Sequence, residues 1–251
     1  MIKYQKTEGL TEVPTHYCPG CTHGILHKLD AEVLEEMNLL QETVGVASVG
    51  CSVFSYQYFN NDMTQAPHGR ACAVATGIKR VLPDRTVFTY QGDGDLASIG
   101  IAETIHAANR GENITVIFAN NATYGMTGGQ MAPTTLIDQK TTTSPRGRKQ
   151  AGTGLPLRMS ELLATVPGAT YLERVSVHDP KHVRKAKKAL EKAFEVQTKK
   201  QGFSMIEFVS TCPVNWGINP TDSIKWAVDN LIPYYPLGVY KDATEEDRDE
   251  S

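Results

Sequence analysis

Five runs of mostly apolar residues recur along the chain, and polar or turn-forming residues separate them. Each run is six to eight residues long and lacks the strict polar alternation of a half-exposed strand. Such runs are typical of strands that are buried on both faces of a sheet. We therefore expect strands at residues 43–50, 86–91, 114–120, 169–175 and 203–210.

Between these runs, apolar residues recur at the spacing of one helix face. In the segment after Thr22, for example, Ile25, Leu29 and Val33 lie four residues apart. This pattern predicts helices at residues 23–38, 69–80, 97–110, 180–197 and 222–231. The lysine-rich helix at 180–197 is expected to turn a basic face to solvent. Strands that alternate with helices predict an α/β fold with a doubly wound, mostly parallel sheet.

Two segments do not fit this alternation. Residues 134–156 are rich in Thr, Gly and Arg and have no apolar period, so they predict a long loop, which is usually functional. The segment after Gly238 ends in acidic residues, and we expect it to fray. The chain shows no internal repeat and no linker, which favours a single domain.

The composition narrows the function classes. The chain has 251 residues and a net charge of -3, with 40% hydrophobic and 21% charged residues, so no basic field favours nucleic acid or a membrane surface. The sequence has no signal-like apolar region near its start and no apolar run of about 18 residues. We expect a cytoplasmic protein. Its five cysteines, an odd number, favour thiol or metal chemistry over a disulfide framework.

The stretch QGDGDLASIG follows the predicted strand at 86–91. A Gly-x-Gly turn before a helix presents backbone N–H groups to a phosphate, but a carboxylate there would repel it. The turn also fits the G-x-G-x-x-A dinucleotide pattern, which expects an acidic residue at the end of the next strand. Here that strand ends in Asn120 and Asn121 instead, so a dinucleotide site is disfavoured.

A magnesium ion between the carboxylate and a diphosphate would remove the conflict. Asp93, Asn121 and the backbone carbonyl of Thr123 would supply oxygen ligands from two strand ends. Gly94 and Asp95 would then offer N–H donors to the diphosphate. The plain alternative is an ordinary turn in which an aspartate caps the helix.

Four cysteines point to a second site. Cys18 and Cys21 form a Cys-Pro-Gly-Cys turn, whereas Cys51 and Cys212 each follow a predicted strand. The turn suits zinc or an iron–sulfur cluster, and the lack of a second Cys-x-x-Cys favours a [4Fe–4S] cube. Cys51 alone could equally be a small buried thiol. Cys72 lies among Ala and Val, which indicates core packing.

With both motifs, the chain resembles the β subunit of the 2-oxoacid:ferredoxin oxidoreductases from residue 16 to about 238. The resemblance rests on the segments HYCPGCTHG, SVGCS, APHGRACAVATGIKRVLPD, YQGDGDLASIG, NNATYGMTGGQMAPTT and STCPVNWG. It implies a sheet of the thiamine diphosphate-binding type, in one cofactor-binding domain over residues 1–251. Within that domain it implies a cluster loop at about 16–24 and a C-terminal extension at about 212–251.

The resemblance also implies the site residues. Mg²⁺ would be bound by Asp93, Asn121 and Thr123, and the [4Fe–4S] cluster by Cys18, Cys21, Cys51 and Cys212. The contacts to thiamine diphosphate would be Val49, Gly50, Cys51, Ser52, His68, Gly94, Asp95, Gly125 and Met126. His68 could instead cap or pack at the start of a helix. The other histidines carry no comparable signal.

The implied reaction converts a 2-oxoacid, coenzyme A and oxidised ferredoxin to acyl-CoA, CO₂ and reduced ferredoxin, with thiamine diphosphate as the electron sink. The catalytic glutamate matches no motif here and is expected on an α subunit, so this chain alone should be inactive. A γ subunit, a ferredoxin-like δ subunit and ferredoxin itself are further partners that the resemblance suggests.

The substrate depends on one position in this chain. Some relatives that use 2-oxoglutarate or a broad range of 2-oxoacids have a lysine three residues after the third cluster cysteine, and in this chain that position is Phe54. An apolar wall favours a branched-chain 2-oxoacid such as 2-oxoisovalerate, then 2-oxoglutarate, then pyruvate. Two alternatives remain: a thiamine-dependent lyase without redox function, and a noncatalytic subunit that uses a Cys₄ metal site for docking.

Overall fold

A single sheet organises the computed structural model, which describes residues 5–244. In these residues the strands run in the spatial order β2-β1-β3-β4-β6-β5-β7, and every neighbouring pair is parallel except β5 with β7. The strands are β1 (Thr43–Ala47), β2 (Asp62–Gln65), β3 (Thr86–Gly92), β4 (Thr115–Asn120), β5 (Ala169–Ser176), β6 (Phe203–Val209) and β7 (Gly238–Asp242). The predicted α/β fold with a mostly parallel sheet is confirmed.

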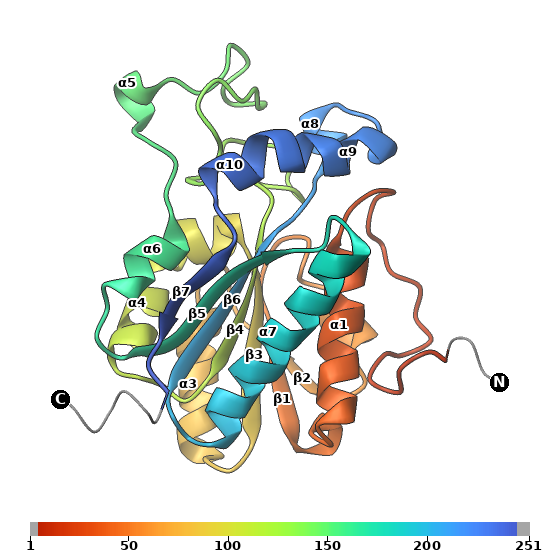
Figure 1. The fold of residues 1–251 in the computed structure, drawn as a ribbon, viewed down its shortest axis with the longest axis vertical. Coiled ribbons are helices and arrows are strands. Elements are labelled where there is room, and N and C mark those ends of the chain that lie inside the picture. Colours follow the sequence, from red (N-terminus) through yellow and green to blue (C-terminus); the bar gives the residue numbers. More distant parts are fainter. Residues whose placement is uncertain (1–4, 245–251) are drawn as a thin grey trace.

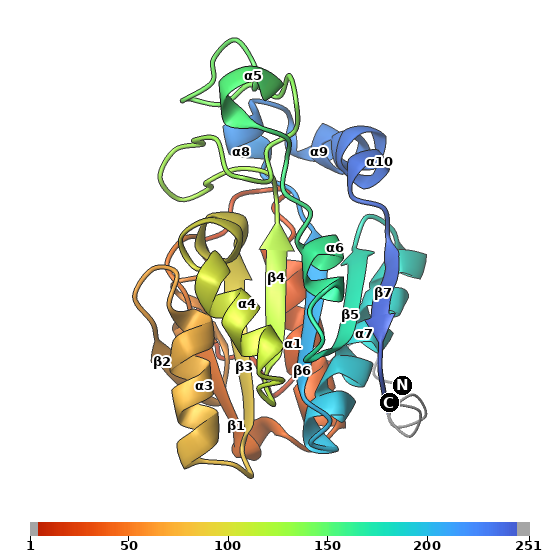
Figure 2. The same ribbon diagram turned by 90° about the vertical axis from the view of Figure 1, so that its left-hand side faces the viewer.

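Helices cover both faces of this sheet (Figures 1 and 2). One face packs against α1 (His23–Glu36) and α7 (Pro180–Thr198), and the other against α3 (Ala71–Val81), α4 (Ile101–Asn109) and α6 (Met159–Ala164). The central strands β4 and β6 are therefore buried along their whole length. This double burial is the physical reason for their mostly apolar runs.

Helix α7 has the predicted amphipathic form. Asp179 caps its start by accepting a hydrogen bond from the backbone N–H of His182 at 2.8 Å, and Pro180 occupies the first turn. Ala186 and Leu190 are fully buried against the sheet and α1, whereas most of its lysines face solvent.

Two edge strands escaped the sequence analysis. β2 is short, polar and largely exposed, so it has no apolar run. β7 lies in the segment that we expected to fray, and that expectation is wrong for residues 239–242, which pair antiparallel with β5. An edge strand has a hydrogen-bonded neighbour on one side only and is more exposed to solvent, so it needs no apolar run. The acidic end at 245–251 lies outside the described residues.

Most of the short helices lie near the carboxyl ends of the strands (Figure 1), whereas η1 (Leu40–Glu42) directly precedes β1. The predicted helix at 97–110 begins with a π-helical turn, η2 (Asp95–Ile99), before α4. The predicted helix at 222–231 belongs to a longer run of α9 (Pro220–Trp226), η3 (Ala227–Leu231) and α10 (Ile232–Tyr234). The other short elements are η1 (Leu40–Glu42), α2 (Ser55–Tyr58), α5 (Gln150–Thr153) and α8 (Pro213–Trp216). Among residues 5–244, no helix is both long enough and apolar enough to cross a membrane.

The predicted loop at 134–156 contains only the short helix α5, and one buried arginine organises it. The guanidinium of Arg148 donates to the carbonyls of Pro133, Thr135 and Leu155 at 2.7 to 3.0 Å. These bonds tie the two ends of the loop together. The loop stands above the carboxyl ends of the strands (Figure 2).

Asp30 on α1 should make the chain less stable as the pH rises. Its side chain is fully buried, and neither carboxylate oxygen has a hydrogen-bond partner among residues 5–244. Burial raises the pKa of Asp30 well above its usual value, so the folded state keeps a proton that the unfolded state loses near pH 4. Above that pH, the free energy of unfolding should fall by up to about 1.4 kcal/mol per pH unit until the raised pKa is passed.

The measurement is urea denaturation of the full chain between pH 5 and 8. Asp30→Asn should remain more stable than the wild type, by a margin that widens with pH. Asp62→Asn, an exposed position on β2, is the control and should follow the wild-type curve. Parallel curves for Asp30→Asn and the wild type would contradict the prediction.

Candidate functional site

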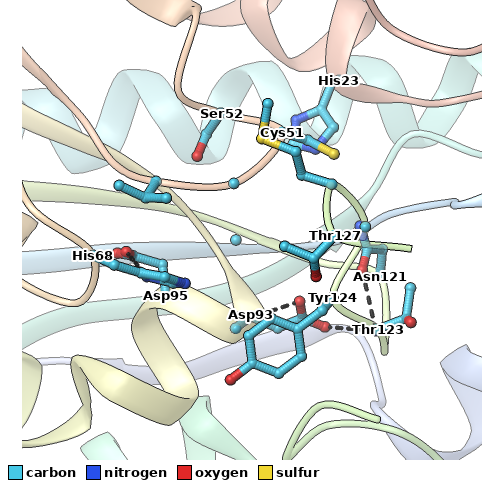
Figure 3. Close-up of a pocket in the computed structure, with 16 residues that line it drawn as sticks. His23, Cys51, Ser52, His68, Asp93, Asp95, Asn121, Thr123, Tyr124 and Thr127 are labelled. Carbon is cyan, nitrogen blue, oxygen red and sulfur yellow. Dashed lines mark hydrogen bonds and ion pairs between the residues drawn. The ribbon is translucent and has the colours of Figure 1, made fainter. Parts of the chain in front are cut away.

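A pocket of about 520 Å³ opens at the carboxyl ends of β1, β3 and β4 (Figure 3). The chain leaves β1 toward β2 on one side and returns to β3 on the other, so the pocket lies where the strand order reverses. Ligands of open α/β sheets bind at such switch points. All the predicted contacts to thiamine diphosphate and Mg²⁺ line this pocket: Val49, Gly50, Cys51, Ser52, His68, Asp93, Gly94, Asp95, Asn121, Thr123, Gly125 and Met126.

Asp93 is one of two buried carboxylates that line this pocket. One oxygen accepts hydrogen bonds from Thr123 N at 3.0 Å and Thr134 Oγ1 at 2.7 Å, and the other from Gly94 N at 3.0 Å. Thr123 N also lies 3.2 Å from Asn121 Oδ1, so the three predicted magnesium ligands form one group. Burial nevertheless raises the pKa of Asp93 to about 7, because its neutral donors do not replace water or a cation fully.

The glycine at position 94 is required by a close contact. A Cβ atom there would lie 2.3 Å from Cε1 of Tyr124, so no other residue fits without displacing the ring. Gly50, on the facing loop, has φ of +125°, a conformation that favours glycine. Gly50 leaves partly exposed backbone beside the pocket, as binding of a diphosphate requires. Gly94 also lines the pocket, but it is buried and its N–H donates to Asp93 Oδ1.

His68 is held by the side chain of Asp95, the first residue of the π-helical turn η2. Its Nδ1 lies 2.7 Å from Asp95 Oδ1, and the other Asp95 oxygen accepts from Gln91 Nε2 at 2.6 Å. Both oxygens of the Asp95 side chain are thus engaged within the protein. His68 lines the pocket. No side chain caps α3, the helix that follows it, so the capping interpretation is wrong and the contact with the cofactor stays a prediction.

The four cysteines gather beside the pocket. Cys51 lines the pocket, and a Cβ on Gly125 would lie 3.0 Å from its sulfur and 3.7 Å from that of Cys212. Burial, with a smaller contribution from the charges of the neighbouring cysteines, raises the pKa of Cys21 and Cys51 to about 12. Four thiols close enough to oppose one another's ionisation need a cation to become thiolates.

Hydrogen bonds fix the Cys-Pro-Gly-Cys turn to the loop of Cys212. Thr211 Oγ1 donates to the carbonyl of Gly20 at 2.6 Å, and Thr22 Oγ1 lies 2.6 Å from Ser210 Oγ. Asn215 donates to Cys212 Sγ at 3.1 Å and to the carbonyl of Gly125 at 2.7 Å. The cysteine group and the pocket therefore share a wall.

The spacing of the sulfurs bears on the kind of metal. Within residues 5–244, no three cysteine sulfurs lie within 4.8 Å of one another. Four sulfurs on one zinc, at about 2.3 Å from the metal, would lie roughly 3.8 Å apart. A cube whose cysteines bind different irons needs a wider arrangement. Cys72 is fully buried in α3 and donates to Gln91 Oε1 at 3.3 Å, so its assignment to the core is correct.

Several pocket residues escaped the sequence analysis. Thr134 reaches Asp93 from the start of the long loop, and Gly92, Tyr124 and Thr127 complete the lining. His23, which gave no signal among the histidines, also lines the pocket, and its Nδ1 lies 2.7 Å from the hydroxyl of Tyr90. Burial lowers its pKa to about 4, so the ring is neutral at pH 7. The one feature of the sequence that could have indicated His23 is its position two residues after Cys21.

Phe54 does not line the pocket. Its ring packs edge-on against His16, with 5.0 Å between the ring centroids. It therefore lies in an aromatic group beside the cysteine turn, to which Tyr17 and Tyr58 also belong. Phe54 could contact a substrate only if the substrate site extends from this pocket past Cys51, so its predicted role in substrate choice depends on that extension.

Comparison with known proteins gives a consistent picture. Residues 46–208 match the family described as thiamine pyrophosphate enzyme, C-terminal TPP binding domain. The ketoisovalerate oxidoreductase subunit VorA of Methanothermobacter thermautotrophicus is 45% identical over 97% of this chain and 51% of that subunit. The chain thus spans about half the length of the first of these curated relatives.

Two further relatives align over most of their own length. The 2-oxoglutarate synthase subunit KorB of Methanocaldococcus jannaschii is 37% identical, covering 98% of this chain and 87% of that subunit. The 2-oxoglutarate:ferredoxin oxidoreductase from Magnetococcus marinus, with 2-oxoglutarate, coenzyme A and succinyl-CoA bound, has a similar structure. It has a TM-score of 0.78 and 26% identity, over 97% of this chain and 87% of that chain.

Proposed function

The chain belongs to the family of 2-oxoacid:ferredoxin oxidoreductase subunits within the thiamine pyrophosphate enzymes, and on that premise we propose that it is the cofactor-binding β subunit of a branched-chain 2-oxoacid:ferredoxin oxidoreductase. The reaction proposed is conversion of a 2-oxoacid and coenzyme A to acyl-CoA and CO₂, with reduction of ferredoxin. The observation that carries the proposal is the shared wall between the Asp93 pocket and the four cysteines. The lyase and docking alternatives are not favoured, since the relatives are named as oxidoreductase or synthase subunits.

The pocket fits thiamine diphosphate with Mg²⁺. Asp93, Asn121 and Thr123 offer a buried carboxylate, an amide oxygen and a backbone carbonyl, which is the oxygen donor set of a hard cation. A cation would compensate the buried charge of Asp93, which neutral donors stabilise only in part. When bound, thiamine diphosphate supplies the electron sink for decarboxylation. His68 and the backbone at Gly50 and Gly94 would hold its position.

The cysteines fit a [4Fe–4S] cluster. Cys18, Cys21, Cys51 and Cys212 come from three separate loops, and their spacing is wider than one zinc ion requires. Cys51 lines the cofactor pocket, which would place the cluster beside the reacting ring. We propose the cluster loop at about 16–24 and the extension at about 212–251 as parts of one cofactor-binding domain.

The catalytic acid is proposed to come from a partner subunit. Among the described residues, the carboxylates that line the pocket are Asp93 and Asp95, and no glutamate is among them. Asp93 would bind the metal, and Asp95 is engaged with His68 and Gln91. Exposed apolar side chains near the pocket, Met126 and Val214, suit coverage by an α subunit. Further γ and ferredoxin-like δ subunits and ferredoxin complete the proposed assembly.

The function is tested by anaerobic purification of the chain with its co-expressed partners. The complex should reduce ferredoxin with 2-oxoisovalerate and coenzyme A faster than with 2-oxoglutarate, and slowest with pyruvate. The chain alone should be inactive and should regain turnover when the α subunit is added. Full turnover by the isolated chain, or CO₂ release without reduction of ferredoxin, would refute the proposal.

Substrate choice gives a second test, which rests on Phe54. The relatives at 45% and 46% identity are named for ketoisovalerate, in agreement with an apolar residue here. Phe54→Lys should raise kcat/KM for 2-oxoglutarate relative to 2-oxoisovalerate by about tenfold, because a lysine can pair with the second carboxylate. Tyr56→Lys, which adds the same charge at a neighbouring exposed side chain, is the control. An unchanged preference in Phe54→Lys would assign substrate choice to another residue.

A further inference from the structure

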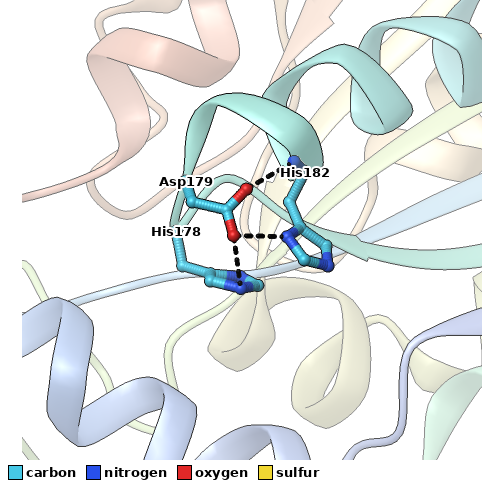
Figure 4. A group of neighbouring side chains, drawn as sticks. All are labelled: His178, Asp179 and His182. Carbon is cyan, nitrogen blue, oxygen red and sulfur yellow. Dashed lines mark hydrogen bonds and ion pairs between the residues drawn. The ribbon is translucent and has the colours of Figure 1, made fainter.

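A second group of metal-ligating side chains lies away from the pocket, where β5 ends and α7 begins. His178, Asp179 and His182 are the one set of three such residues within the described part of the chain whose ligand atoms all lie within 4.8 Å of one another (Figure 4). None of them lines the cofactor pocket. All three side chains are partly buried and remain reachable from solvent.

Both imidazoles face the same carboxylate oxygen. Asp179 Oδ2 lies 2.8 Å from His182 Nδ1 and 3.3 Å from His178 Nε2. The other oxygen, Oδ1, caps the helix by accepting from the backbone N–H of His182. The cap thus fixes the carboxylate and leaves Oδ2 at the centre of the group. Helix capping alone accounts for an aspartate at position 179. It does not account for two histidine rings that both face Oδ2 of this aspartate.

His178 is oriented as a ligand would be. Its Nδ1 lies 3.1 Å from Ser176 Oγ, so that ring nitrogen has a partner of its own, and Nε2 is directed toward Asp179. A metal-binding histidine commonly has such a second partner, which fixes the ring and its tautomer.

We propose that His178, Asp179 and His182 form a binding site for a late first-row divalent cation, such as Zn²⁺, Co²⁺ or Ni²⁺. Two imidazoles and one carboxylate are the donor set that these ions prefer, and solvent would complete the coordination. Since His182 also lines a separate cavity of about 360 Å³, formed by residues of β5, α7 and the start of β7, the site has an entry path.

The ion would fasten the end of β5 to the first turn of α7. That helix packs along α1, and the Cys-Pro-Gly-Cys turn directly precedes α1. The site would therefore be structural. It would stabilise the helical layer of α1 and α7, which the cysteine turn directly precedes. It does not depend on the proposed function.

The test is titration of the cluster-loaded complex with Co²⁺ and Zn²⁺ under anaerobic conditions. His178→Ala and His182→Ala keep the Asp179 cap, and each should weaken binding by on the order of tenfold or more. The double variant should bind one ion fewer per chain and lose the metal-dependent rise in Tm. His106→Ala, an exposed histidine on α4, is the matched control and should bind as the wild type does.

The difference spectrum on adding Co²⁺, from which the absorption of the cluster cancels, separates this site from the cysteines, since only thiolate ligands give sulfur-to-cobalt charge-transfer bands. Cobalt binding without those bands, lost in the double variant, supports the site. Equal stoichiometry and affinity in the wild type, the double variant and His106→Ala would overturn it. Circular dichroism should show unchanged helix content in all variants, so loss of fold would not be mistaken for loss of a ligand.

Discussion

Asp93→Asn is expected to lower the affinity of the complex for Mg²⁺ and thiamine diphosphate by roughly two to four orders of magnitude. Removing one partner of a buried charge pair costs about 3–5 kcal/mol, which corresponds to that range. Asp93 is 2% exposed, so water could not take its place as a ligand of the bound cation. The reduction of ferredoxin should fall with the cofactor content.

The fold should survive this change. Asparagine is neutral and isosteric, and its amide oxygen can still accept from Thr123 N and Thr134 Oγ1, although its amide nitrogen then faces Gly94 N and that hydrogen bond is lost. Removing the buried charge also removes its desolvation cost, which offsets this loss, so the Tm of the cofactor-free protein should stay close to that of the wild type. Loss of activity through unfolding would instead lower the Tm.

The measurements are the bound thiamine and magnesium of the purified complex, its Tm, and ferredoxin reduction at saturating cofactor. Asp62→Asn, which removes one exposed carboxylate on β2, is the control and should change none of them. A variant that keeps its thiamine diphosphate and its turnover would leave the GDGD segment as an ordinary helix-capping turn.

This site could be predicted because parallel strands bring their carboxyl ends to one edge. Asp93 and Asn121 end two strands that are neighbours in the sheet, so sequence order alone implied their proximity. The same geometry brought Cys51 and Cys212 to that edge. Local motifs sufficed wherever a strand fixed both the position and the direction of a side chain.

The rest depends on contacts that no local pattern encodes. Thr134 reaches Asp93 only because Arg148 ties together the two ends of a loop without periodicity. His23 meets the pocket through the packing of α1 against Tyr90. Phe54 was placed by its distance along the chain from Cys51, yet the short helix α2 turns it toward His16. Sequence spacing does not determine direction in a loop.

Cys212→Ala should separate the two proposed cofactors. Cys212 does not line the thiamine pocket, so the variant should keep its thiamine diphosphate and magnesium. It should lose the cluster, about four irons and four sulfides per chain, because a cube with one unligated iron is unstable. Ferredoxin reduction should then be lost although the 2-oxoacid still binds.

The control is Cys72→Ala, which removes a fully buried thiol that lies outside the group of four. This variant should keep its iron and its EPR signal after reduction with dithionite, and any clusters on partner subunits cancel in the comparison. The two variants should therefore lose different cofactors. Asp93→Asn should lose thiamine diphosphate and keep its iron, whereas Cys212→Ala should lose iron and keep its thiamine diphosphate. If Cys212→Ala retains its iron, or if the wild type contains zinc, the electron path does not pass through this subunit, and a thiamine-dependent lyase becomes the better explanation of the pocket.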